Sequence, residues 1–560
     1  MIKVFLISDF FIDEVKGGAE FCNDALIKLL TPDIKIISLK SKKTTVDFVE
    51  KNLNSFFIVA NFFQLSEDVK AALSKTTYVI LEHDHKYLKS NNPSLYRDFL
   101  APESQLQNKS FYRNALAVLC QSKKHAAVVQ RNLLINNIVN LGGNIWEEAQ
   151  LSILEDNMHA EKTIKYGVLQ SNNRNKGTPA ATAYCEQMGL DFELIRPKPF
   201  PEFIKDISQI ETLVFFPQWL ETFNRFSIES RILGCKLITN SLIGAASEDY
   251  FSLKGKELLN FIRKNNQNLR RRWLKLIDSG TIEYFPPPTL PKITVFCPLY
   301  AGEKHIEGFL KSMQNQTIFH RCELIIIDAN SPENERQYIE EFMEEYDNVI
   351  YKRTERRITV MESENMAIHM ATGEFFAQAC VDDRHHKEYL EIMSKHLYYH
   401  EDIDLVYADC LQTMQPNETV ENNSSDGHRY EHSLNQFSPE NMIKCLPGPM
   451  PMWRLSIHEK CGYFNEEMSY AGDWDMFLRM VEIGSKFKKI DIPLGLYYFN
   501  SEGLSTSAEN QAPRGKEEAQ VFFKYKDIFG PANYNKYKKY FSQITRSKNE
   551  PTTQIPSYTF

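Results

Sequence analysis

Two neighbouring aspartates, Asp382 and Asp383, directly follow an apolar run at residues 375–381. Such a run is typical of a buried strand, so both carboxylates would emerge where the strand ends. A divalent cation held by one or two carboxylates neutralises the charge of a departing diphosphate. Aspartate is also a common N-terminal cap of helices, and the pair alone does not separate the two roles.

The segments around this pair alternate between strand-like and helix-like patterns. We expect strands at residues 293–297, 324–328, 375–379 and 405–408, and helices at 306–314, 335–346 and 363–370. This alternation predicts βαβ units and a parallel sheet, whose ligands bind at the carboxyl ends of the strands. Pro298, Asp328 and Asp382 stand where three of the strands end, so we expect them at one edge.

Several separated motifs occur in a fixed order along this part of the chain. They are Pro298-Leu-Tyr300, Asp328-Ala-Asn-Ser-Pro332, Asn365-Met-Ala-Ile-His-Met-Ala-Thr-Gly-Glu374, the Asp382-Asp383 pair, Gly448-Pro-Met-Pro-Met-Trp-Arg454 and Ala471-Gly-Asp-Trp-Asp475. The set covers about residues 292–510 and resembles family 2 glycosyltransferases of the GT-A fold, especially bacterial members that build surface polysaccharides.

The resemblance implies a role for each matching residue. Donor-binding residues would be Pro298, Tyr300, Asp328 and Asp382, metal ligands would be Asp383 and Asp382, and the general base would be Asp473. The cofactor implied is Mn²⁺ or Mg²⁺. A carboxylate base that deprotonates the acceptor hydroxyl acts by single displacement, which inverts the anomeric carbon.

This sequence departs from the family pattern at two positions. Gly472 stands where the family has a glutamate before the base, and Asn500 stands near a frequent metal-binding histidine. His385 is either a replacement ligand or a histidine on a surface helix. Trp453 either stacks on the acceptor sugar or belongs to the core.

The first half of the chain contains a second set of candidate residues. Glu221 and Glu229 are eight residues apart, which on one helix would place them on roughly one face. We expect Glu221 in the loop before a helix and Glu229 within it. A buried glutamate there could bind a ribose diol, and the alternative is an exposed helix acid.

Residues 1–250 resemble GT-B glycosyltransferases of the family 4 type, which carry a Glu-x7-Glu element. The resemblance implies a catalytic Glu221 and a set of donor-binding residues: Gly17, Gly18, His83, Lys176 and Glu229. Lys176 would counter the diphosphate in place of a cation. The first site would therefore retain the anomeric configuration and use no metal or other cofactor.

The bulk composition excludes several classes of protein. The 560 residues carry a net charge of −8, and 42% of them are hydrophobic. The absence of a basic excess argues against nucleic acid as a partner. The ten cysteines show no disulfide or metal spacing, and no apolar run reaches the length of a membrane span. The N-terminal run meets Asp9 within one strand length, so we expect no signal peptide and a cytoplasmic protein.

We expect an α/β fold, with a GT-B-like pair of Rossmann-like halves joined to a C-terminal GT-A domain. The boundaries predicted are 1–252 (halves about 1–150 and 151–252), 253–290 for a basic amphipathic helix and proline-rich linker, 291–530, and 531–560 for a tail. The linker helix would either pack between domains or lie on an anionic membrane surface as a peripheral contact.

The function predicted is sugar transfer from a UDP-, GDP- or dTDP-linked donor to a growing surface polysaccharide or lipid-linked glycan. The leading hypothesis is a bifunctional enzyme with two active sites. The alternative is one active C-terminal transferase with a non-catalytic N-terminal binding or docking module. A nucleotidyltransferase ranks lower, because residues 298–303 lack the glycine- and arginine-rich loop of that class.

Overall fold

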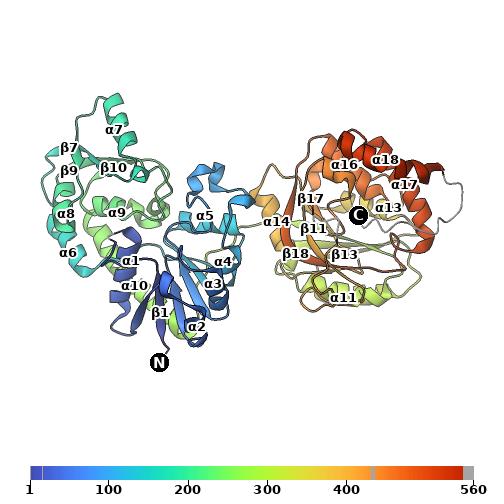
Figure 1. The fold of residues 1–560 in the computed structure, drawn as a ribbon, viewed down its shortest axis with the longest axis horizontal. Coiled ribbons are helices and arrows are strands. Elements are labelled where there is room, and N and C mark those ends of the chain that lie inside the picture. Colours follow the sequence, from blue (N-terminus) through green and yellow to red (C-terminus); the bar gives the residue numbers. More distant parts are fainter. Residues whose placement is uncertain (1, 16, 431–434, 547–560) are drawn as a thin grey trace. The chain divides into compact units, whose positions relative to one another are not determined.

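The computed structural model describes residues 2–15, 17–430 and 435–546, and its chain divides into two compact units, residues 1–287 and 288–560 (Figure 1). Strands occur where the sequence predicts them: residues 322–328 form β12 and residues 375–378 form β14. Among the described residues, no helix combines the length and the apolar character that crossing a membrane requires.

The first sheet of unit 1 is parallel, and its strands follow the order β2-β1-β3-β4-β5-β6. Its strands are β1 (Val4–Ser8), β2 (Ile36–Lys40), β3 (Phe56–Val59), β4 (Thr77–Leu81), β5 (Ala117–Cys120) and β6 (Ile138–Asn140). Its helices are α1 (Gly18–Leu30), α2 (Val46–Glu50), α3 (Glu67–Leu73), α4 (Lys109–Asn114) and α5 (Lys123–Leu133). Apolar side chains of α1 pack on one face of the sheet, and those of α3, α4 and α5 on the other.

The second sheet of unit 1 has the order β10-β9-β7-β8 and is also parallel. Its elements are α6 (Glu148–Asn157), β7 (Ile164–Leu169), α7 (Thr178–Gln187), β8 (Phe192–Ile195), α8 (Phe200–Ser208), β9 (Ile210–Phe215), α9 (Arg225–Ile232) and β10 (Lys236–Thr239). The strand order reverses between β7 and β9, and ligand crevices of open parallel sheets lie at such points.

The helix expected as a linker is a core element of unit 1. Helix α10 (Gly255–Ser279) contributes Leu258 and Ile262 to the core of the second half, and Leu269 and Trp273 to that of the first. Its apolar face is therefore covered by both halves and is not free to lie on a membrane. The hydrophobic spacing indicated a helix, but only packing shows which surfaces cover it.

Unit 2 contains one mixed sheet with the order β13-β12-β11-β14-β17-β16-β18-β15. Its strands are β11 (Ile293–Leu299), β12 (Cys322–Asp328), β13 (Val349–Arg353), β14 (Phe375–Gln378), β15 (Arg384–His385), β16 (Leu405–Thr413), β17 (Met452–Arg454) and β18 (Phe487–Tyr498). Strands β11 to β14 are parallel and reverse their order between β11 and β14, which predicts a crevice at the ends of these two strands.

The helices of unit 2 include the three that the sequence predicts, each within three residues of its expected bounds. The helices are α11 (Glu303–Gln314), α12 (Glu335–Glu345), α13 (Val360–Met370), α14 (Tyr389–Tyr399), α15 (His458–Cys461), α16 (Gly472–Glu482), α17 (Gln511–Lys524) and α18 (Gly530–Arg546). Part of the expected tail is thus helix α18, which buries Phe541 in the core. Residues 547–560 lie outside the described residues.

Candidate active site

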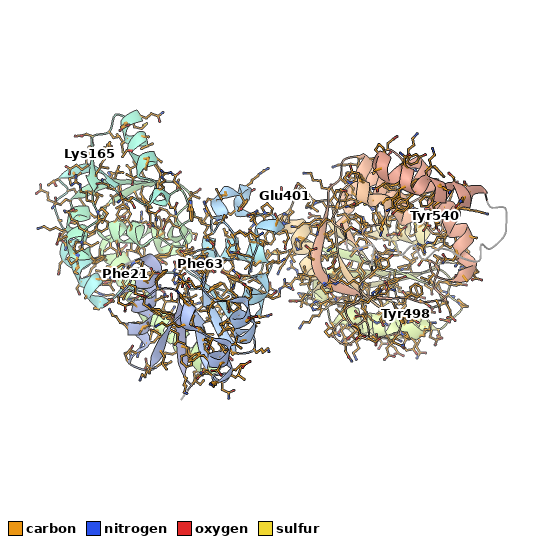
Figure 2. The ribbon with its side chains drawn as sticks, viewed as in Figure 1. Phe21, Phe63, Lys165, Glu401, Tyr498 and Tyr540 are labelled. Atoms are coloured by element: carbon orange, nitrogen blue, oxygen red, sulfur yellow. The ribbon has the colours of Figure 1, made fainter. Side chains whose placement is uncertain are left out.

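The paired aspartates lie in the turn that follows strand β14. Asp382 and Asp383 separate β14 from the short strand β15, beside the point where the sheet reverses its order. Asp383 is 2% exposed, and its Oδ1 accepts a hydrogen bond from the backbone N–H of Tyr498 at 3.1 Å. Tyr498, labelled in Figure 2, ends β18. Burial, followed by the charge of Asp382, raises the pKa of Asp383 well above its ordinary value.

The cationic side chain nearest in sequence to this pair, Arg384, forms its hydrogen bonds with other groups. Arg384 is buried and donates to the carbonyl oxygens of Val381 at 3.0 Å, Asp383 at 2.6 Å and His305 at 3.1 Å. Its guanidinium therefore binds backbone carbonyls and the side-chain oxygen of Asn417, with no hydrogen bond to either carboxylate among the described residues. Metal binding by the paired carboxylates stays a prediction.

The donor set suits a cation that takes only part of its coordination from protein. Within the ranges that the structure describes, no group of three or more His, Cys, Asp or Glu side chains could hold a metal ion. Mg²⁺ commonly binds through one or two carboxylates together with substrate phosphates and water. Asp382 and Asp383 fit that pattern and do not form an all-protein metal cage.

His385 is not a surface histidine, because it lies 5% exposed in β15 with its ring centroid 4.7 Å from that of Tyr389. Burial lowers its pKa to about 3. Trp453 is a core residue, 1% exposed, and its indole N–H donates to His458 at 3.0 Å. It is therefore not exposed for stacking on an acceptor sugar.

Asp328 ends β12 and is fully buried. Its carboxylate accepts from the backbone N–H of Ser331 at 2.7 Å, the hydroxyl of Tyr351 at 2.5 Å and the guanidinium of Arg353 at 2.6 Å. Most of its hydrogen-bonding capacity is used inside the protein, so it also shapes the turn after β12. A direct contact with a nucleoside stays a prediction.

Tyr300 follows Pro298 and the end of β11, and it is 39% exposed. The guanidinium of Arg357 lies 4.1 Å from the centroid of its ring. An exposed aromatic ring beside a planar cation is a surface on which a nucleobase can stack. A contact between Tyr300 and the donor nucleoside stays a prediction.

Asp473 lies in the first turn of α16. Its Oδ1 accepts from the backbone N–H of Trp474 at 2.7 Å, and its Oδ2 lies 3.8 Å from the Cys445 sulfur. Burial raises the pKa of Asp473. A carboxyl with a raised pKa is a stronger base than an ordinary aspartate, which suits it to deprotonating a hydroxyl.

Glu364 is an acidic residue that the sequence interpretation missed. It lies on α13, is fully buried, and neither of its carboxyl oxygens has a hydrogen-bond partner among the described residues. Burial and the charge of Asp473 raise its pKa well above the ordinary value. The signal in the sequence is its spacing: Met361, Glu364 and Ile368 lie on one helix face, so an acid shares the apolar stripe.

In unit 1 the structure brings Lys176 and Glu221 together. The Lys176 ammonium lies 2.8 Å from Oε1 and 3.1 Å from Oε2 of Glu221. Lys176 follows β7 and Glu221 follows β9, so they meet where the second sheet reverses its order. As predicted, Glu221 precedes α9 and Glu229 lies within it.

His83 belongs to a hydrogen-bonded chain that links both halves of unit 1. Its Nδ1 accepts from the Gln121 amide at 2.7 Å, and Gln121 in turn accepts from the Thr222 hydroxyl at 2.9 Å. Burial lowers the pKa of His83 to about 3, so the imidazole is neutral. Thr222 is next to Glu221 in the chain, so the hydrogen-bonded chain from His83 ends beside the Lys176–Glu221 ion pair.

Glu229 has a different environment from Glu221. It is 5% exposed and accepts from the Trp146 indole at 3.0 Å and from the Arg225 guanidinium at 3.4 Å. These partners hold α9 against the segment before α6, which is a structural role that the spacing of the two glutamates did not reveal. A contact between Glu229 and a ribose stays a prediction.

Gly17 and Gly18 stand at the N-terminus of α1, as the glycine-loop interpretation requires. Gly18 has open space around it, whereas a Cβ at Gly17 would meet the Glu20 carboxylate. The pKa of Glu20 is raised by burial and by the charges of Asp84 and Asp9. The helix N-terminus would attract a phosphate, but these acids would repel it.

Residues 294–462 match the protein-family model described as glycosyl transferase family 2. An uncharacterized glycosyltransferase of Methanocaldococcus jannaschii is 22% identical over 202 residues, 36% of this chain and 68% of that protein. The hyaluronan synthase of Pasteurella multocida is 24% identical over 248 residues, 42% of this chain and 23% of that protein. Among solved structures, S. aureus TarS 1–349 in complex with UDP-GlcNAc is 17% identical, with a TM-score of 0.36, over 44% of this chain and 73% of that chain.

The matched residues include Asp328, Asp382, Asp383 and Glu364, while Asp473 lies beyond them. The relatives named for a function are glycosyltransferases, and this chain spans about a quarter of the hyaluronan synthase. Unit 2 is an α/β domain whose mixed sheet contains the parallel strands β11 to β14, with Asp328 at the end of β12 and the paired aspartates after β14. Residues 294–462 are therefore a glycosyltransferase family 2 domain, and the protein is a glycosyltransferase.

Proposed function

We propose that the chain transfers sugars from nucleotide-sugar donors to a growing surface polysaccharide or another glycan acceptor. The observation that carries this proposal is the position of Asp382 and Asp383, at the end of β14 within the family 2 match. The nucleotide would lie along the ends of β11 and β12, near Tyr300 and Asp328. A UDP-, GDP- or dTDP-linked sugar fits the proposal equally.

In the C-terminal site, a divalent cation held by Asp383 and Asp382 would supply charge neutralisation for the departing diphosphate. Asp473 accepts the proton of the acceptor hydroxyl as its oxygen forms a bond to the anomeric carbon. The bond between that carbon and the diphosphate oxygen breaks on the opposite side, so the configuration inverts. Tyr300 and Arg357 offer the surface on which the donor base stacks.

We assign a second transfer site to unit 1, at the Lys176–Glu221 ion pair. There the Lys176 ammonium takes the place of a metal ion opposite the diphosphate, and transfer retains the anomeric configuration. The ion pair supports this assignment because it joins the two predicted residues across adjacent strand ends. In the alternative, unit 1 binds or docks a glycan without catalysis and the C-terminal site alone is active.

The test uses the full chain with UDP-, GDP- and dTDP-sugars and a panel of oligosaccharide acceptors, with Mn²⁺ or with a chelator. D473A and E221A are compared with the wild type for each sugar added. Loss of one transfer step in D473A and of a different step in E221A supports two active sites. Intact transfer in E221A supports the single-site alternative, and no transfer from any nucleotide sugar contradicts the proposed function.

A further inference from the structure

Helix α17 contributes a carboxylate that binds the chain immediately before α16. Glu517 is half-buried and accepts hydrogen bonds from the backbone N–H groups of three consecutive residues. Ser469 donates to Oε1 at 2.9 Å and to Oε2 at 3.1 Å, Tyr470 to Oε2 at 2.8 Å and Ala471 to Oε2 at 3.0 Å. Because hydrogen bonds to an ionised acceptor are stronger than neutral ones, Glu517 holds the path of the chain over these three residues.

The N-terminus of α16 depends on this acceptor from another helix. The first N–H groups of a helix have no partner within it, and a Ser, Thr, Asp or Asn cap usually supplies one. Here the cap residue is Ala471, which has no side-chain acceptor. Glu517 lies 46 residues after it in the chain. Its negative charge also interacts favourably with the positive end of the helix dipole.

Helix α17 also holds the chain on the other side of Asp473. Asp475 is buried, and its Oδ1 accepts from the Lys524 ammonium at 2.7 Å and from the Tyr525 hydroxyl at 2.9 Å. Lys524 is the last residue of α17, and Tyr525 follows it. The end of α17 thus binds the residue two positions after Asp473, while Glu517 binds the residues before it. The backbone of Asp473 is therefore held between two points of contact.

A third contact limits the first turn of α16 from α13. Met361 fills the space over Gly472, where an added Cβ would lie 2.3 Å from the methionine sulfur. The turn therefore cannot move toward α13 without displacing a core side chain. Of the contacts around this turn, those of Glu517 are the ones that bind the backbone directly.

We propose that Glu517 is a positioning residue for Asp473: its carboxylate holds residues 469–471 and so fixes the helical turn that contains the candidate base. The proposal rests on the proposed function of the C-terminal site, in which Asp473 accepts the proton of the acceptor hydroxyl. Glu517 forms no bond with the sugar and exchanges no proton with it. The family 2 match ends at residue 462, so Glu517 lies outside the matched residues.

Two substitutions weaken these hydrogen bonds by different amounts. E517Q keeps the shape and one accepting oxygen but removes the charge, whereas E517M keeps a similar volume and removes every acceptor. We expect kcat to fall about 3- to 10-fold in E517Q and about 10- to 100-fold in E517M, because a displacement of about 1 Å at a reacting group can cost roughly 100-fold. Donor KM should stay within about twofold of the wild type, since the loss is confined to the transition state.

The matched control lies at the opposite end of the same helix. Glu482 ends α16 and is exposed, so E482Q removes the same charge without affecting residues 469–471. E482Q should keep the wild-type kcat. Rates are compared at a temperature at which circular dichroism shows every variant to be folded, so that a loss of folded protein does not lower kcat.

A double-mutant cycle separates positioning from a general loss of structure. If Glu517 acts through Asp473, it has little left to position when the base is removed. E517Q should therefore lower the residual kcat of D473N by less than about twofold, although it lowers the wild-type kcat by more. A residue that only stabilises unit 2 would lower both rates by the same factor, and that result would overturn the proposal.

Hydrogen exchange supplies a readout that requires no activity. The amides of residues 469–471 should exchange about tenfold faster or more in E517M than in the wild type, because their acceptor is gone. The amides of β11 and β12 should exchange at the wild-type rate in both. Mass spectrometry of peptides from the full chain measures this difference. Equally faster exchange throughout unit 2 would indicate a general structural role and contradict the proposal.

The outcomes distinguish this inference from the proposed function. If the wild type transfers no sugar from any nucleotide sugar, the proposed function fails and this proposal fails with it. If the wild type transfers sugar but E517M does so at the wild-type rate, only the inference about Glu517 is wrong. Unchanged exchange of residues 469–471 in E517M leads to the same conclusion.

Discussion

The two candidate sites differ in whether their carboxylates have a counter-charge within the protein. In unit 1, Glu221 forms an ion pair with Lys176 at 2.8 Å, so its carboxylate has a counter-charge within the protein. In unit 2, Arg384 next to Asp383 binds backbone carbonyls, and Glu364 has no partner among the described residues. The candidate site of unit 1 thus contains both an acid and its counter-charge. The candidate site of unit 2 contains several acids whose negative charge must be neutralised by a cation or by protonation.

This difference predicts different chemical requirements. A fixed ammonium meets a diphosphate without a metal ion, although the donor must first compete with Glu221 for it. Paired aspartates bind a diphosphate only through a divalent cation, since like charges repel. The comparison therefore predicts that metal removal and point substitutions affect the two sites separately.

The largest effect is expected for the base. D473N should lower C-terminal transfer by roughly 100- to 10,000-fold, the range of general-base catalysis, while donor binding persists. Because burial raises the pKa of Asp473, the wild-type rate should fall as pH drops through a value above that of an ordinary aspartate. Steady-state rates across pH measure both effects. A D473N enzyme with normal kcat would exclude Asp473 as the base.

Metal removal should separate the two sites. A chelator should abolish the transfer that depends on Asp473, and Mn²⁺ or Mg²⁺ should restore it. D383N removes a predicted metal ligand and should raise the metal concentration needed for half-maximal rate by about 100-fold or more, because the loss of an outer supporting group alone costs about 10- to 100-fold. Metal titrations of the rate measure this shift. If the same transfer step persists in the presence of the chelator, the site of unit 2 does not require a metal ion, and this difference between the two sites is wrong.

A smaller effect is expected at the ion pair of unit 1. In the presence of a chelator, K176M should lower the affinity of unit 1 for the nucleotide sugar by about tenfold or more, because it removes the charge opposite the diphosphate. A double-mutant cycle of K176M and E221Q should give a stability coupling of only about 0.2–1 kcal/mol, since the pair is partly exposed. Thermal shift assays provide both numbers. A coupling of several kcal/mol would indicate a structural pair instead.

The smallest effect on transfer is expected for Glu229. E229Q should lower the free energy of unfolding by about 1–3 kcal/mol, because Trp146 and Arg225 lose a charged acceptor. Donor affinity should stay within about twofold of the wild type if these partners are its whole role. Denaturant unfolding and donor titration provide the comparison. A large loss of donor affinity with normal stability would restore the predicted contact with the ribose.

The sequence by itself determined the local structure and the order of the candidate site residues along the chain. Apolar runs that end in polar residues located β12 and β14 and placed Asp328 and Asp382 at strand ends, because strand periodicity is a local property. The order of the motifs alone indicated a family 2 domain, in agreement with the family model that matches residues 294–462. The spacing of Glu221 and Glu229 correctly placed one before α9 and the other within it.

Only the tertiary structure decided which of these residues have partners and which do not. Lys176 and Glu221 are 45 residues apart, and their contact depends on the pairing of β7 with β9. Helix α13 packs on the first turn of α16 because Met361 fills the space over Gly472, a detail of side-chain volume that no spacing contains. The periodicity of residues 255–279 predicts helix α10, but only the structure shows that both halves of unit 1 pack against its apolar face. Partners and burial depend on contacts between distant segments, so the sequence predicts the residues and the fold decides their chemistry.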